Sequence, residues 1–548
     1  MVTFLKRNIQ LIIIFLIAIG LRTIHLGTIP NGFHVDELDA GYIGRYIWTH
    51  GKDILGNYLP FVYNKFGDYR PTGIFYLSGL SALIFGSTEF AVRFPAALIG
   101  GITVVAIYFL ALEFFSNKSI ALFSAILLAV MPWHLVLSRA TSEGIIGLFF
   151  VILGLGLLMK SYRTNSPRMM IVAGLSLIAS YLFYHPFRIL VPLCLLPLLF
   201  TPGRHKHIKL ASIILFCLAS FFTLLTVFTV AGNGRLNQVA FYQNPDLATL
   251  TQDLIAGEGP NNVLEARIFH NKIVAFTQEF VKQYSSYFST EFLIQTGGLP
   301  KRYAVPQEGL IYVSFFVLFI IGLLTIISYK VKWKSLYILY LLVIAPLPAA
   351  VTYEDTPNIH RAVFLILPII LLTAYGLYRL LDLVKSKTKN YIFLLIIVLC
   401  IISVETINFW HYYTIFAPSS ESYSRDDGLA QLVQLAYAEK GKYKYIYLPG
   451  YENLPLYYLF YTSDYQNIHF RNNPNDVLLD KIDNVIFVPD WCSTRYLRWK
   501  NLLAPSTLII DRDDCEGFTG IGKIGEIDRK DLTKAFKLLR FIPEEYHK

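Results

Sequence analysis

The sequence predicts a polytopic α-helical membrane protein with about eleven transmembrane helices, one helix on the membrane surface and a small C-terminal α/β domain. Of the 548 residues, 54% are hydrophobic and only 16% are charged, which leaves too little polar surface to cover one soluble globule. Apolar runs recur from residue 9 to residue 409, and a charged, Tyr-rich stretch follows. This change predicts a boundary between residues 1–409 and residues 410–548.

The first apolar run, Ile9 to Leu21, lies between the basic pair Lys6 and Arg7 and a further basic residue, Arg22. No small-residue cleavage site follows, so we interpret the run as a retained first helix and not as a signal peptide. The net charge of +10 does not indicate a nucleic-acid partner, because basic residues of a membrane protein first occupy its cytoplasmic loops.

Loop charges decide which apolar runs cross the membrane. The runs are residues 8–26, 72–86, 91–114, 119–137, 143–160, 169–185, 187–200, 208–231, 309–329, 335–351, 361–383 and 391–409. If the N-terminus is inside and 72–86 lies on the outer surface, sixteen lysines and arginines fall in inner segments and three in short outer connections. The sixteen are Lys6, Arg7, Lys118, Lys160, Arg163, Arg168, Arg204, Lys206, Lys209, Lys330, Lys332, Lys334, Arg379, Lys385, Lys387 and Lys389. A crossing at 72–86 would reverse this bias, so we predict eleven crossings, of which 187–200 is short and contains two prolines.

This topology places four regions on the outer face: residues 27–90, 232–308, 352–360 and the part after 410. The surface segment, Pro71 to Gly86, is shorter than the roughly 20 residues that a span needs. In the second outer loop, Val263 to Tyr287 has apolar residues near helical spacing, and we expect it to lie over the membrane surface.

The C-terminal part combines strand and helix patterns. Residues 444–448, 484–488 and 507–510 are short apolar runs that predict buried strands, and Asp426 to Glu439 predicts an amphipathic helix. These elements indicate an α/β unit. Because the topology places this extracytoplasmic domain in an oxidising compartment, Cys492 and Cys515 are predicted to form a disulfide.

The candidate site begins in the first outer loop, with His34-Val-Asp36-Glu37 and, further on, Asp68-Tyr-Arg70-Pro71. Acidic residues at a membrane edge are costly to desolvate and mark function or pairing, although a solvated loop is the alternative. The topology brings further charged residues to the same face. They are Arg93, Arg139, Glu143, His360 and Arg361.

A carboxylate pair among arginines suits an anionic substrate beside a hydroxyl nucleophile. Arginine binds phosphate through paired hydrogen bonds, and a neighbouring carboxylate accepts the proton of an attacking hydroxyl. Each arginine has an alternative role at a helix end, with its charge extended to the interface. We prefer that role for Arg188, and the two roles are equally compatible with Arg93 and Arg361.

The sequence assigns no cofactor, and a divalent metal is an alternative. Four histidines fall on the outer side without a spacing that defines a metal site: His34, His134, His185 and His360. The string Asp511-Arg-Asp513-Asp514 resembles a metal–nucleotide-sugar motif, but a solvated turn is favoured. The chain has no glycine-rich phosphate loop, so the sequence does not support ATP- or NAD-driven chemistry.

These motifs, followed by Phe85-Gly86-Ser-Thr-Glu-Phe-Ala-Val-Arg93-Phe-Pro and by Ser138-Arg139, resemble the GT-C membrane glycosyltransferases. The similarity is to the bacterial branch related to protein O-mannosyltransferases and to the lipid A aminoarabinose transferase, over residues 8–409. It implies a GT-C fold with a juxtamembrane helix between the first two spans. It also implies that Asp36 is the catalytic base with Glu37 beside it, and that Arg70, helped by Arg93, binds the lipid phosphate.

The chain departs from the family in three places. Loop 232–308 is too short for the β-trefoil of the mannosyltransferases. Asp490-Trp491-Cys492 does not match the Trp-Trp-Asp signature of the oligosaccharyltransferases, which argues against transfer to asparagine. Tyr69 stands where a metal-binding acid is expected in the lipid A branch.

We therefore predict a multi-pass cell-membrane transferase. It would move a sugar from a polyprenyl-phosphate donor to a hydroxyl acceptor (protein, lipid or glycan) on the outer face, with inversion at the anomeric carbon. Membrane lipid is a further predicted partner, and nucleic acid is not. A transporter or flippase of a lipid-linked sugar is the alternative, but it would place ionisable residues near the bilayer midplane and often show matching halves. A third possibility is an assembly protein that acts through its C-terminal domain.

Overall fold

The computed structural model describes residues 2–65, 67–200, 206–229, 239–328, 333–386, 390–451, 453–462 and 480–542. The chain divides into two compact units. The first contains Met1–Ile24, Gly67–Pro71 and Ala96–Tyr412, and the second contains His25–Phe66, Thr72–Pro95 and Tyr413–Lys548. Of the predicted inner basic residues, Arg204, Lys330, Lys332, Lys387 and Lys389 lie outside the described residues, as does the beginning of loop 232–308.

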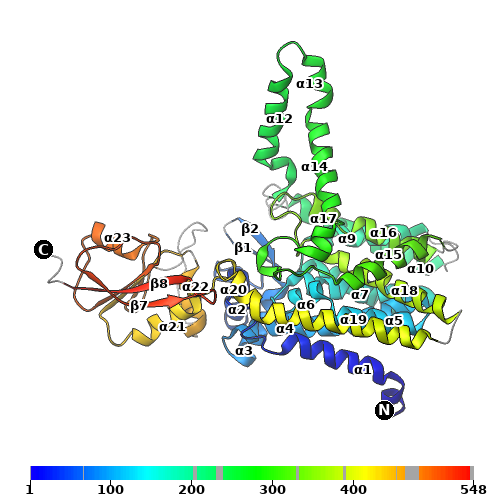
Figure 1. The fold of residues 1–548 in the computed structure, drawn as a ribbon, viewed down its shortest axis with the longest axis horizontal. Helices are drawn as coiled ribbons and strands as arrows, with labels where there is room; N and C mark the ends of the chain where they lie inside the picture. The colour runs from blue at the N-terminus through cyan, green and yellow to red at the C-terminus, as the bar shows by residue number, and fades with distance from the viewer. Residues whose placement is uncertain are drawn as a thin grey trace. The chain divides into compact units, whose positions relative to one another are not determined.

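The first unit is a bundle of apolar helices of different lengths (Figure 1). They are α1 (Val2–Thr23), α4 (Glu89–Phe115, from residue 96), α5 (Lys118–Val130), α6 (Pro132–Ser138), α7 (Glu143–Thr164), α8 (Pro167–Ala179), α9 (Pro186–Leu195), α10 (Lys206–Phe228), α15 (Val313–Ser328), α16 (Trp333–Ile344), α17 (Leu347–Ala350), α18 (Ile366–Lys385) and α19 (Tyr391–His411). Strand β2 (Asp68–Pro71) also belongs to this unit.

Among the described residues, six helices are long and apolar enough to cross a membrane. The pair α5–α6, bent by 57°, makes a seventh if it counts as one span. The other predicted crossings fall on shorter apolar helices: α1, α8, α9 and α15. The prediction of a multi-pass membrane protein is thus confirmed, and the number of eleven crossings stays a prediction.

The bend between α5 and α6 follows from Pro132. Met131 has an extended backbone, with φ −62° and ψ 121°, as the residue before a proline prefers, and Pro132 has no N–H to continue the helix. Buried Arg22 donates hydrogen bonds to the carbonyls of Leu128 at 3.3 Å and Ala129 at 3.0 Å, which lie at this break. Arg22 thereby supplies donors to carbonyls at the end of α5.

A helical hairpin interrupts the series of spans. Its arms are α12 (Pro245–Glu258) on one side and α13 (Val263–Phe269) with α14 (Lys272–Ser286) on the other. The predicted single helix from Val263 to Tyr287 is wrong in one respect, because it is divided at His270 and Asn271. The Asn271 side chain accepts hydrogen bonds from the N–H groups of Ile273 and Val274 and so begins a new helix.

The second unit contains helices α2 (Val35–His50) and α3 (Gly73–Phe85) and strand β1 (Val62–Lys65). The prediction placed a helix at 72–86, where α3 lies, but none at α2. These two helices pack closely because both have glycine at the contact: a Cβ on Gly44 would lie 2.0 Å from the carbonyl oxygen of Phe75. A Cβ on Gly79 would lie 2.1 Å from the carbonyl carbon of Gly44.

The C-terminal part of the second unit contains a six-stranded sheet in the order β4-β5-β3-β6-β8-β7. The strands are β3 (Tyr445–Leu448), β4 (Lys481–Ile482), β5 (Val485–Phe487), β6 (Thr507–Arg512), β7 (Ile521–Asp528) and β8 (Lys534–Phe541). The accompanying helices are α20 (Ala417–Ser420), α21 (Leu429–Glu439), α22 (Leu454–Thr462) and α23 (Ser493–Trp499). Strand β3 pairs in parallel with β5 and β6, whereas the outer pairings are antiparallel.

The sequence predicted β3, β5 and β6 but not the other three strands. It also started the amphipathic helix before these strands too early: α21 begins at Leu429, three residues after Asp426. The reason is local, since Asp426 has φ 56° and Gly428 has φ 100°, and a right-handed helix cannot include either conformation. Cys492 and Cys515 form the predicted disulfide. The division into domains 1–409 and 410–548 stays a prediction.

Candidate functional site

The acidic pair of the first outer loop forms the first turn of α2. His34 is the N-cap, with an extended backbone, and its Nδ1 accepts a hydrogen bond from the Asp36 N–H at 3.1 Å. Two carboxylates at a helix N-terminus are favourable because the backbone dipole is positive there. The loop therefore ends at His34, and Asp36 and Glu37 lie in the first turn of the helix.

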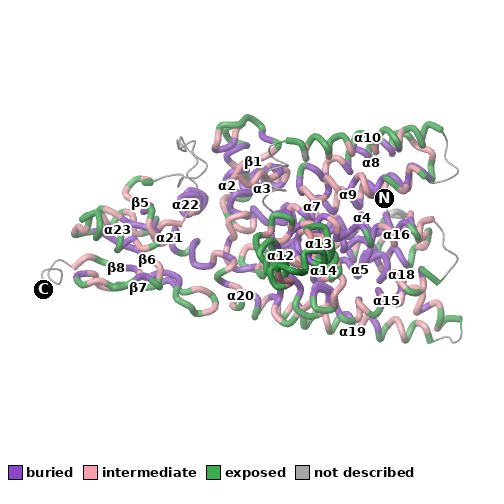
Figure 2. The backbone as a smooth tube through the Cα atoms, turned by 90° about the horizontal axis from the view of Figure 1, so that it is seen from above, coloured by how far each residue is buried: buried purple, intermediate pink, exposed green. Residues whose placement is uncertain are grey.

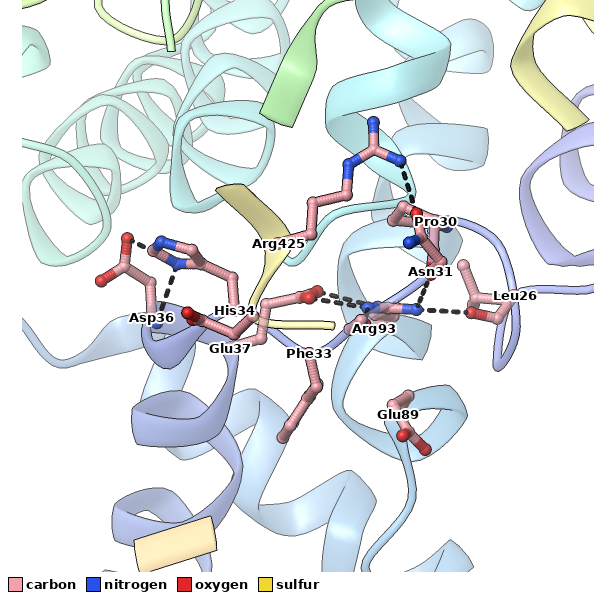
Figure 3. A network of polar contacts seen from close by, with 12 residues as sticks. Leu26, Pro30, Asn31, Phe33, His34, Asp36, Glu37, Glu89, Arg93 and Arg425 are labelled. Atoms are coloured by element: carbon pink, nitrogen blue, oxygen red, sulfur yellow. Dashed lines mark hydrogen bonds and ion pairs between the residues drawn. The ribbon is translucent and has the colours of Figure 1, made fainter. Parts of the chain in front are cut away.

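Glu37 and Arg93 form a buried pair with two parallel hydrogen bonds (Figure 3). Arg93 Nε donates to Glu37 Oε1 at 2.8 Å, and Arg93 Nη2 donates to Oε2 at 2.7 Å. Glu37 is 6% exposed and Arg93 is fully buried. Such fork-to-fork geometry is the strong form of this pair and fixes the direction of both side chains.

Arg93 also holds the segment between α1 and α2. Its Nη1 donates to the carbonyl oxygens of Leu26 at 3.3 Å and Pro30 at 2.8 Å, and Nη2 donates to Gly32 O at 2.6 Å. With the two bonds to Glu37, all five N–H groups of this arginine are engaged. This arrangement favours Arg93 as a residue that positions Glu37, and its predicted contact with a lipid phosphate stays a prediction.

Asp36 points toward His34 and away from Arg93 (Figure 3). Its Oδ2 lies 3.3 Å from His34 Nδ1, and the Asp36 side chain is one-third exposed. This contact is an ion pair only when His34 is protonated. Asp36 thus has the more accessible of the two carboxylates.

A third acid, Asp426, lies at the same helix end, and the sequence analysis did not select it. Its Oδ2 accepts a hydrogen bond from the Val35 N–H at 3.1 Å and lies 3.3 Å from the hydroxyl of Tyr457, which donates to Phe33 O. Burial raises the pKa of the Asp426 carboxyl, and the nearby His34 acts in the opposite direction. The charged string from Arg425 to Asp427, near the start of the C-terminal part, is the sequence signal that could have indicated it.

The other predicted residues belong to the first unit. Arg70 Nε donates to Asp68 Oδ2 at 2.9 Å on β2. Arg139 is fully buried, and its guanidinium donates to the carbonyls of Leu21 and Ile24 at 2.8 Å each. These carbonyls lie at the end of α1, so Arg139 caps that helix.

Glu143 and His360 come together at the N-terminus of α7. His360 Nε2 lies 2.7 Å from Ser142 Oγ and 3.9 Å from Glu143 Oε2, and it accepts the Gly144 N–H at 3.3 Å. The next residue, Arg361, instead donates to Thr352 Oγ1 at 2.9 Å and Glu354 O at 2.7 Å.

The predicted site residues therefore form two sets. Asp36, Glu37 and Arg93 are in the second unit, and Arg70, Arg139, Glu143, His360 and Arg361 are in the first. The convergence of both sets on one substrate stays a prediction. In the described ranges, no group of three or more His, Cys, Asp or Glu side chains could hold a metal ion.

Comparisons with known proteins show a likeness of fold to membrane glycosyltransferases. Residues 69–231 match the family described as dolichyl-phosphate-mannose-protein mannosyltransferase. ArnT from Cupriavidus metallidurans bound to undecaprenyl phosphate is 13% identical with a TM-score of 0.54, over 97% of this chain and 98% of that chain. Its apo state is 11% identical with a TM-score of 0.53, over 96% and 97%.

An oligosaccharyltransferase from Archaeoglobus fulgidus, in the apo form, is 15% identical with a TM-score of 0.50. The match covers 86% of this chain but only 61% of that protein. No curated protein matches the chain. The chain therefore has the GT-C fold, and its predicted resemblance to the GT-C membrane glycosyltransferases is confirmed.

Proposed function

We propose that the protein transfers a sugar from a polyprenyl-phosphate donor to a hydroxyl acceptor at the outer face of the cell membrane. The observation that carries the proposal is the accessible carboxylate of Asp36 on a rigid helix end, directly beside a glutamate that Arg93 holds in place. The likeness to a fold whose solved example binds undecaprenyl phosphate supports a lipid-phosphate donor.

The proposed chemistry is one displacement at the anomeric carbon. Asp36 accepts the proton of the acceptor hydroxyl while its oxygen forms the new bond to the sugar. The bond from the sugar to the lipid phosphate breaks, and its electron pair leaves with the phosphate. Attack from the opposite side inverts the anomeric configuration.

The leaving phosphate needs charge stabilisation more than it needs a proton donor. Arg70 is the residue proposed for this task, because its guanidinium is partly exposed, with 29% of the side chain accessible. Glu37 and Arg93 would keep the N-terminal turn of α2 in position. Arg139, Glu143, His360 and Arg361 are proposed to contact the donor or the acceptor.

The substitution Asp36→Asn tests the base. Removing a general base typically lowers the rate about 10²- to 10⁴-fold, and asparagine keeps the size of the side chain. The assay would measure release of polyprenyl phosphate from a panel of polyprenyl-phosphate sugars by protein reconstituted in membranes. Asp246→Asn is the matched control, since Asp246 is an exposed acid in the predicted second outer loop and should leave the rate unchanged. Full activity of Asp36→Asn would reject the assignment.

A further inference from the structure

The hairpin of α12, α13 and α14 has more exposed apolar side chains than is usual for a segment that faces water. Leu264 is 67% exposed and Ile273 is 78% exposed. Six others in the outer half of the hairpin are also exposed: Leu250, Leu254, Ile255, Val263, Ile268 and Phe269. Clustered exposed apolar residues mark a surface that a partner or a membrane covers.

The base of the hairpin is fixed to the bundle. Tyr284 donates its hydroxyl hydrogen to Val343 O at 2.7 Å, and the Phe241 N–H donates to Val351 O at 3.0 Å. Ring contacts continue along α14, from Phe276 against Phe241 to Phe280 against Tyr284. The inner half is therefore rigidly supported, and the exposed apolar residues lie beyond it.

The orientation of the hairpin relative to the bundle helices indicates what covers its exposed apolar side chains. In Figure 1 the apolar helices of the bundle run horizontally, whereas α12 and α14 stand across them and extend past the bundle. Figure 2, turned by 90°, shows α12, α13 and α14 end-on and mostly exposed, while α18 and α19 still run lengthwise. A segment perpendicular to membrane-spanning helices lies parallel to the membrane plane. Its attachment at Val343 and Val351 is near the end of α16–α17, opposite Lys334.

A groove between the two arms of the hairpin adds to this surface. It has a volume of about 970 Å³, and its exposed lining is mainly apolar, with Leu247, Ile255, Val263 and Phe276 beside polar residues such as Arg267 and Lys272. A groove of this kind, open to the surroundings, suits the tails of lipids better than water.

We propose that the outer half of this hairpin is inserted into the outer leaflet of the bilayer, where acyl chains cover its apolar side chains and fill the groove. Residues 245–286 contain five carboxylates and three lysines or arginines, so attraction to anionic head groups does not drive the insertion. Apolar burial drives it, as for other helices that lie in a membrane interface. This inference is independent of the proposed transferase activity.

Spin-label accessibility in proteoliposomes tests the proposal with two positions on one helix. Ile273 and Lys282 are nine residues apart, and at about 100° per residue they lie on opposite faces of α14. Both are exposed, so a label disturbs little packing. Each would be replaced by cysteine in a full-length chain with Cys217→Ser and Cys400→Ser, because Cys194 is buried and the other two cysteines form the disulfide.

The label at Ile273→Cys should collide preferentially with oxygen, which concentrates in the bilayer, and the label at Lys282→Cys with a water-soluble nickel complex. The contrast should be the same in vesicles of phosphatidylcholine and of phosphatidylglycerol. Equal access of nickel at both positions would overturn the proposal. Shielding of Ile273→Cys from both reagents, with coupling between labels, would indicate a second copy instead and would also overturn it. Leu264→Cys and Gln278→Cys provide a second pair if either first variant does not fold.

Discussion

Asp36 and Glu37 are neighbours in the chain, but α2 gives their side chains different surroundings. Successive helical residues point about 100° apart, so Glu37 meets Arg93 in the interior while Asp36 stays accessible beside His34. Both oxygens of the buried Glu37 carboxylate are occupied by Arg93, whereas one-third of the Asp36 side chain is exposed. This difference supports Asp36, and not Glu37, as the proposed base.

The pair of Glu37 and Arg93 leads to a stability prediction. Arg93→Lys keeps the charge but cannot reproduce the two parallel bonds to Glu37 or the three bonds to backbone carbonyls. Hydrogen bonds to charged groups contribute about 1.5–3 kcal/mol each when buried, so we expect a clearly lower melting temperature. Thermal unfolding of the purified protein in detergent measures it.

The chain contains a matched control for this substitution. Arg163 and Glu113 form the same two-bond geometry, at 2.8 and 2.7 Å, but 61% of the Arg163 side chain is exposed. Exposed pairs contribute only about 0–1 kcal/mol, so Arg163→Lys should hardly change the melting temperature. Equal effects of the two substitutions would contradict the role of burial.

Among the helices, the contact between α15 and α18 depends on glycine. A Cβ on Gly376 would lie 1.9 Å from the carbonyl oxygen of Leu318, and a Cβ on Gly322 would lie 2.0 Å from that of Leu372. Small residues at such contacts let two membrane helices approach until their backbones touch. The contact therefore has no space for even one methyl group.

Gly376→Ala is expected to separate α15 from α18 and to lower the free energy of unfolding by about 1–3 kcal/mol, because the clash is with backbone. Gly20→Ala is the control, since no atom lies within 4 Å of its Cβ position in α1, and there alanine should be neutral or stabilising. Thermal unfolding in detergent compares them. An unchanged melting temperature of Gly376→Ala would show that the helices are not in this contact.

For the whole molecule, the distribution of basic residues predicts an N-terminus inside and a C-terminal domain outside. Leu532→Cys, at an exposed position after β7, should react with a membrane-impermeant thiol reagent in intact cells. Thr164→Cys, exposed at the end of α7, should react only after the membrane is opened. The background would lack Cys217 and Cys400. Labelling of Thr164→Cys in intact cells would reject the predicted topology.

The sequence by itself determined the class of fold and most of its elements. Composition and loop charge depend only on residue type, and membrane insertion selects for them directly. The apolar runs therefore coincide with helices, the short run at 72–86 with α3, and the three apolar strands with β3, β5 and β6. Asp36 and Glu37 could be selected because acids beside a membrane are rare.

Only the tertiary structure decided what each charged residue contacts. Partners such as Arg93 for Glu37 and Val35 for Asp426 lie 56 and 391 residues away, and no local pattern specifies such distances. The sequence analysis also missed the hairpin arm α12 and the strands β7 and β8. The stability of these elements depends on other segments that pack against them in the folded chain. The local sequence determines where the helices form, and packing between distant segments determines the surroundings of Asp36.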